Sequence, residues 1–127
     1  NISNNIKENL NFFARNLKLF QEDKDFADKD LEKNIYLNNK SHLINLNILN
    51  YATNSKYKFK NFSETLNKIL KSKVHVFQVD GKYLLQNGMK EGSTLGRVLK
   101  IIEDEWIDNN FKISKDRVKE IIKTNLS

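Results

Sequence analysis

The placement of glycine is the strongest constraint on how this chain folds. All four glycines of the 127-residue sequence lie within sixteen positions, at 81, 88, 92 and 96, and the chain contains no proline. Glycine readily adopts left-handed backbone conformations and allows close approach of another chain. The sequence therefore uses backbone freedom at a few set points in one short stretch.

The residues around these glycines predict a helix, a turn and a second helix. Asp80 is expected to cap a short helix over residues 81–87, with Gly88 as its left-handed C-terminal residue. A tight turn follows, and Ser93 or Thr94 is expected to be the N-cap of the next helix. The free N–H groups at the start of that second helix would form a site for a phosphate.

The second helix carries one apolar stripe and one unusual glycine. Leu95, Leu99, Ile102 and Trp106 recur at spacings of four, three and four residues. Gly96 lies inside the helix, where glycine costs about 1 kcal/mol relative to alanine. Such a residue indicates close approach of a packed helix or of an RNA strand, and tight helix packing is the favoured interpretation.

The whole stretch resembles the C-terminal body of the class II tRNA nucleotidyltransferases, the family of CCA-adding enzymes and bacterial poly(A) polymerases. The resemblance is firm over residues 79–122, although Tyr83 stands where the family usually has an aspartate. The positions that match the family pattern in order and spacing are Gly81, Leu84, Leu85, Gly88, Gly92, Gly96, Leu99, Glu103, Trp106 and Ile107.

The resemblance implies a cytoplasmic, non-catalytic module that grips the acceptor arm and elbow of tRNA through phosphate and shape contacts. Its expected partners are tRNA and the enzyme's own head and neck domains, with neither membrane nor DNA. Mg²⁺ and CTP or ATP would bind the parent enzyme's catalytic head, and this portion would need no cofactor. The chain begins at Asn1, which is expected for a trimmed C-terminal fragment.

Hydrophobic periodicity predicts helices along the rest of the chain. They are expected over residues 4–20, 31–37, 43–52, 61–72 and after 114, with an acidic turn at 21–30 and a connector at 74–79. Ser3, Asn61 and Ser114 are the expected N-caps. The fold class is all-α, a bundle of about six or seven short helices. Residues 1–127 are expected to form a single helical domain, with upstream helices over 1–78 and the glycine-motif pair and last helix over 79–127.

The positive charge is concentrated in the middle of the chain. The net charge is +6, and the basic residues are mostly lysine, a bias that an AT-rich genome also produces. Residues 38–79 nevertheless carry seven basic side chains and one acidic one, whereas the segments on either side are close to balance. A one-sided excess of this kind is typical of a phosphate-binding surface.

Lysines alternate with aromatic residues over 56–60, where lysines would meet phosphates and Tyr57 would stack on a base. The favoured alternative is that the aromatic residues anchor the loop in the core. The residues expected to contact RNA are Lys56, Lys58, Lys60, Lys68, Lys71, Lys82, Lys90, Ser93, Thr94, Arg97 and Lys100.

Catalytic and metal-binding patterns are weak in this sequence. The acidic pairs at 23–25 and 28–30 imitate the family's metal-binding D-x-D, but neither follows a Gly-Ser turn and an apolar strand. His42 and His75 have no ligand residue at helical spacing, and no phosphate-binding glycine loop occurs. No metal site and no catalytic residue are therefore expected.

Two other functions fit the same residues. One is a helical protein-interaction or dimerisation module that never contacts RNA, with Trp106 and the acidic residues from Glu103 to Asp108 forming its interface. The other is a helix-hairpin-helix DNA binder. It is less favoured because the G-x-G hairpin that this motif requires is absent.

Overall fold

The structure is a computed structural model that describes residues 2–126, and this part of the chain contains seven helices and no strand. The chain divides into two compact units, one ending at Val74 and the other beginning at His75. The all-α fold class is confirmed. The unit boundary lies four residues before the expected division at 78/79, and the formation of a single domain stays a prediction.

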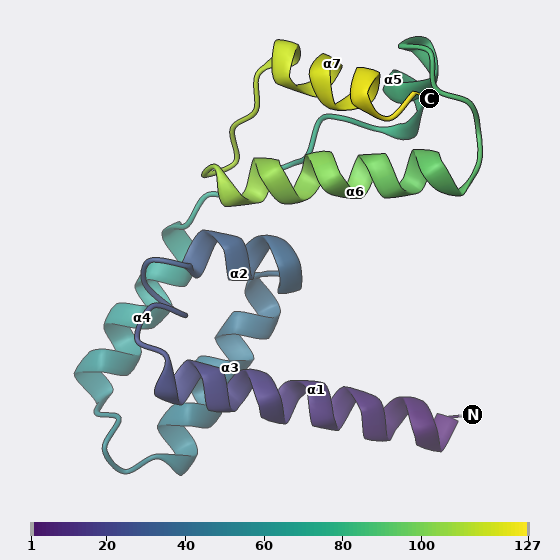
Figure 1. The fold of residues 1–127 in the computed structure, drawn as a ribbon. Coiled ribbons are helices and arrows are strands. Elements are labelled where there is room, and N and C mark those ends of the chain that lie inside the picture. Colours follow the sequence, from purple (N-terminus) through teal and green to yellow (C-terminus); the bar gives the residue numbers. More distant parts are fainter. Residues whose placement is uncertain (1, 127) are drawn as a thin grey trace. The chain divides into compact units, whose positions relative to one another are not determined.

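The first unit contains four helices, of which α3 is the central one (Figure 1). These are α1 (Ile2–Glu22), α2 (Leu31–Asn38), α3 (Lys40–Thr53) and α4 (Phe59–Lys71). Helix α3 packs against the other three, and Leu43 and Leu46 on it are fully buried. The acidic segment between α1 and α2 forms turns, as expected, but Phe26 within it is buried in the core.

The second unit contains α5 (Gly81–Gln86), α6 (Ser93–Asp108) and α7 (Lys115–Thr124). Helix α6 packs against both of the others. The Asp80 carboxylate accepts a hydrogen bond from the Tyr83 N–H at 2.9 Å, and the Ser114 hydroxyl accepts one from the Arg117 N–H at 3.0 Å. Both predicted N-caps are therefore confirmed. Residues 73–80 form the expected connector without regular structure.

Three other predicted helix starts are wrong. Ser3 lies inside α1, and Asn61 lies in the first turn of α4, which begins at Phe59 after Lys58. Helix α4 starts early because the Phe62 N–H already bonds to the Lys58 carbonyl at 3.0 Å. Helix α6 is preceded by Gly92, with no side-chain cap, so Ser93 is its first residue.

None of the helices within residues 2–126 combines the length and the apolar character that crossing a membrane requires.

Candidate nucleic-acid interface

The five predicted RNA-binding lysines of the first unit lie on α4 and in the loop before it. Lys56 and Lys58 lie in the loop before the helix, Lys60 lies in its first turn, and Lys68 and Lys71 follow toward its end. Lys60, Lys68 and Lys71 share one helical face with the acidic residue Glu64, because these positions are spaced by about one turn. All five lysines are exposed.

These lysines differ in how far their charge is compensated. Lys68 forms an ion pair with Asp28 at 3.2 Å, and the Lys58 ammonium donates to the Ser55 carbonyl at 2.9 Å. Lys56, Lys60 and Lys71 have no ion-pair partner among residues 2–126. Their uncompensated ammonium groups are available to an anionic ligand.

Tyr57 does not stack on a ligand, because its side chain anchors the loop in the core. Its hydroxyl donates to Asn47 Oδ1 at 2.6 Å, and its ring meets the Phe20 ring edge-on at a centroid distance of 6.2 Å. Burial raises the pKa of the Tyr57 hydroxyl. The core-anchoring interpretation is thus confirmed for Tyr57, which is not placed to stack on a base, but not for Phe59, which is 64% exposed.

The glycine turn in the second unit brings together several predicted residues. A cavity of about 390 Å³ is lined by residues 88–94 together with Asn125 and Leu126. Lys90, Ser93 and Thr94 therefore border one cavity at the start of α6, whereas Lys82 lies exposed in the first turn of α5. No side chain caps α6, so the positive end of its helix dipole borders this cavity, which the acidic residue Glu91 also lines.

Arg97 and Lys100 continue along α6 but differ in their surroundings. The side chain of Arg97 is exposed. Lys100 pairs with Asp104 at 2.7 Å and with Glu103 at 4.0 Å, and the hydrogen bond to Asp104 raises the pKa of the Lys100 ammonium. Lys100 therefore contributes less positive charge to the surface than its position predicted.

The acidic end of α6 is tied to α7. Both Glu105 carboxylate oxygens accept hydrogen bonds from the Arg117 guanidinium at 2.8 Å, and Glu120 accepts a third at 2.9 Å. The hydrogen bonds from Arg117 lower the pKa of the Glu105 carboxyl. Part of the acidic face thus has a structural partner within the same unit.

The surroundings of Gly96 differ from those predicted. A Cβ at Gly96 would meet no atom within 4 Å, and the residue lies exposed on α6. Tight packing of a helix against Gly96 is therefore wrong. The glycine that does pack closely is Gly81, where a Cβ would lie 3.2 Å from the Leu95 side chain.

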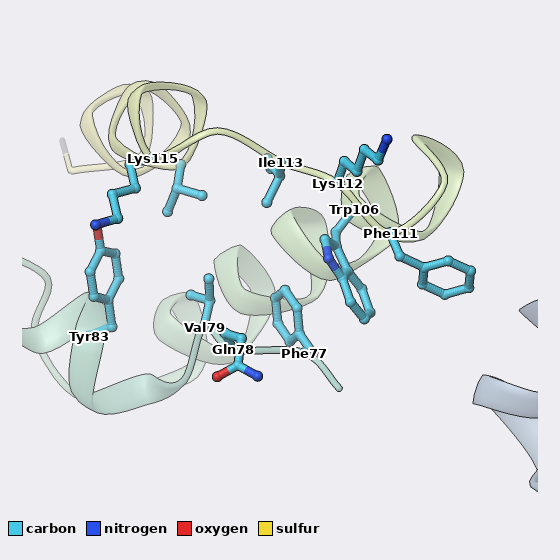
Figure 2. A pocket seen from close by; sticks show the side chains of 10 residues that line it. Phe77, Gln78, Val79, Tyr83, Trp106, Phe111, Lys112, Ile113 and Lys115 are labelled. Carbon is cyan, nitrogen blue, oxygen red and sulfur yellow. The ribbon is translucent and has the colours of Figure 1, made fainter. Parts of the chain in front are cut away.

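Trp106 is buried, as its place on the apolar stripe of α6 predicted, but it also lines a cavity that was not predicted. It is only 8% exposed, and with Phe77 and Phe111 it lines an aromatic cavity of about 470 Å³ (Figure 2). The Phe77 and Trp106 ring centroids are 5.1 Å apart. The sequence did not predict this cavity because its lining residues come from segments that are distant in sequence, including the connector, the end of α6 and the segment that leads into α7.

The histidines and the acidic pairs lie in ordinary packing environments. His42 Nε2 and Asn16 Nδ2 are 3.1 Å apart, and burial lowers the pKa of the His42 imidazole, which favours a neutral ring as acceptor. The His75 ring stacks on Phe111 at a centroid distance of 3.8 Å. Within residues 2–126 no three His, Cys, Asp or Glu side chains are grouped so as to hold a metal ion.

Comparison of the chain with family models, curated proteins and solved structures found no match.

Proposed function

We propose that this chain is the non-catalytic, RNA-binding C-terminal portion of a cytoplasmic tRNA nucleotidyltransferase of the CCA-adding type or of a poly(A) polymerase. It holds a folded tRNA through phosphate and shape contacts while the catalytic head, outside this sequence, modifies the 3′ end. The family assignment rests on the resemblance of the glycine stretch, and the RNA-binding role rests on the charged surface of the first unit.

The observation that carries RNA binding is the separation of basic from acidic residues along the chain, with seven basic side chains and one acidic one in residues 38–79. Lys56, Lys60 and Lys71 are exposed and lack carboxylate partners among residues 2–126, and Glu64 is the sole acid in the segment 38–79. Lysine composition alone would follow from genome bias. A lysine bias alone would not exclude acidic residues from the same segment, and a surface with this excess of positive charge attracts phosphates.

The glycine turn supports a second set of phosphate contacts. Lys90 borders the cavity at the uncapped start of α6, and Arg97 lies exposed one turn further along that helix. The open surface over Gly96 leaves room for a strand of RNA, since no protein atom lies within 4 Å of a Cβ placed there. The glycine-rich start of α6 therefore faces RNA, and the acidic end of the helix faces away from it.

The test is fluorescence anisotropy of the chain with a labelled tRNA at several salt concentrations, against an unstructured RNA of equal length. We expect preference for tRNA and a linear fall of log affinity with log salt, because each phosphate contact releases counterions. Each pair of substitutions, Lys90→Glu with Arg97→Glu and Lys56→Glu with Lys60→Glu, is expected to weaken binding and flatten this slope.

The matched control is Lys7→Glu with Lys18→Glu, which reverses the same charge at exposed positions on α1. If the control weakens binding as strongly as the two site pairs, the attraction is only a consequence of net charge. If wild-type affinity is insensitive to salt, phosphate contacts are not its basis.

One observation favours the alternative of a helical protein-interaction or dimerisation module. On α1, Ile6 is 53% and Leu10 is 65% exposed. Both lie on the same apolar face of the helix as Phe20, which is buried near its other end. Sedimentation of the chain without RNA distinguishes the two functions, because a dimer that Leu10→Asp dissociates would favour a protein interface.

A further inference from the structure

An exposed aromatic surface lies where α3 ends and α4 begins. The Tyr51 ring stacks on Phe62 at a centroid distance of 4.7 Å and an interplanar angle of 23°, and the Phe59 ring lies 6.1 Å from both. We call Tyr51, Phe59 and Phe62 the aromatic corner. The loop between the two helices, visible in Figure 1, joins their ends in the first unit.

The aromatic corner is open to solvent and continues onto α3. Phe59 is 64% and Tyr51 is 42% exposed, and Ile48, one turn before Tyr51 on the same helical face, is 50% exposed. Single exposed apolar residues are ordinary, but a contiguous group of them marks an interaction site. Phe62 is half-buried and stacked beneath Tyr51, so the corner offers a supported ring rather than a loose one.

Positive charge borders the aromatic corner. Lys58 and Lys60 are the chain neighbours of Phe59, and Lys56 lies in the same loop. Lys56 and Lys60 have no ion-pair partner among residues 2–126. A ligand that complements this surface has a flat apolar face and negative charge on its flanks.

We propose that the aromatic corner stacks on one unpaired nucleobase of the bound RNA, with Lys56 and Lys60 contacting the phosphates on either side. This inference rests on the proposed RNA-binding function and adds a contact that a fully paired helix cannot make, because bases in a duplex are already stacked. Stacking on an aromatic ring is tolerant of sequence, so the corner selects an unpaired nucleotide rather than a particular base.

The test compares two labelled RNAs with equal numbers of phosphates, a hairpin with an unpaired loop and a blunt duplex. Phe59→Ala is expected to weaken hairpin binding by about 5- to 150-fold, the range for loss of one base–aromatic stack, and to leave duplex binding unchanged. Phe59→Trp should retain hairpin affinity. A 2-aminopurine in the loop should change its fluorescence on binding wild-type chain and not on binding Phe59→Ala.

The matched control is Leu37→Ala, which removes a side chain 53% exposed at the end of α2 in the same unit and should change neither affinity. Far-UV circular dichroism confirms that each variant is folded.

If Phe59→Ala leaves hairpin binding unchanged while Lys60→Glu weakens binding to both RNAs, stacking is overturned and phosphate binding stands. If the wild-type chain binds neither RNA, both proposals fail. If Phe59→Ala instead abolishes self-association, the corner is a protein interface and the stacking proposal is overturned.

Discussion

At the scale of single residues, the glycines of the motif serve different purposes. Gly88 and Gly92 have φ values of +100° and +142°, a backbone conformation that residues with a side chain rarely adopt. Gly96 has helical geometry and open space around the position of a Cβ. Gly88 and Gly92 are therefore required by the backbone, whereas neither backbone conformation nor packing within residues 2–126 requires a glycine at position 96.

This difference predicts opposite effects of alanine. Gly92→Ala is expected to destabilise the second unit by about 1–3 kcal/mol because the residue would be held in a strained conformation. Gly96→Ala is expected to stabilise it by about 1 kcal/mol because alanine is the better helix former. Urea unfolding followed by Trp106 fluorescence measures both. A stabilised Gly96→Ala variant that also binds tRNA less well would show that Gly96 is kept for RNA; a destabilised one would contradict the open environment described above.

At the scale of elements, one buried amide joins α3 to α4 and to the loop between them. Asn47 is fully buried; its Oδ1 accepts from the Tyr57 hydroxyl, and its Nδ2 donates to the Phe62 carbonyl at 3.1 Å. Phe62 belongs to the aromatic corner and Tyr57 lies two residues before Phe59, so this amide sets the position of the segment that carries Phe59.

Asn47→Ala is expected to destabilise the first unit by about 1–3 kcal/mol or more, because it leaves a hydroxyl and a carbonyl without their partner. The control is Asn45→Ala, which lies on the same helix with an exposed side chain and should have little effect. Thermal unfolding followed by far-UV circular dichroism compares the two. Equal stability of both variants would mean that the Asn47 amide does not hold the loop.

At the scale of the whole molecule, the two units have separate cores. One core gathers Phe20, Leu46 and Ile69 with their neighbours, and the other gathers Leu84 and Ile102 with theirs. No residue belongs to both clusters. Predicted RNA-binding lysines occur in both units, with Lys56 to Lys71 in the first and Lys82 to Lys100 in the second.

Separate cores predict that a core substitution acts on its own unit. Leu46→Ala is expected to cost the first unit about 2–5 kcal/mol, the usual range for a fully buried leucine. The unfolding midpoint of Trp106 fluorescence, which reports on the second unit, should not change. A parallel shift of the Trp106 midpoint would show instead that the two units unfold together.

The sequence alone determined the helical elements and the starts of α5 and α7. Apolar periodicity located the helices, and short-range chemistry located the Asp80 and Ser114 caps and the left-handed Gly88, because each depends only on residues a few positions apart. The excess of basic residues in 38–79 could also be recognised from the sequence, since counting charges requires no knowledge of packing. The N-cap predicted at Asn61 was wrong because the Phe62 N–H bonds to the Lys58 carbonyl, so that α4 already begins at Phe59.

Only the tertiary structure decided which part of each apolar face is covered. On α6 the buried line runs through Val98 and Ile102, while Leu95 and Leu99 are only partly buried. In the segment after α3, Tyr57 turns into the core and Phe59 turns outward, although both are aromatic residues between lysines. Periodicity identifies an apolar side chain, but its burial depends on whether a helix distant in sequence reaches it, and that is a property of the assembled fold.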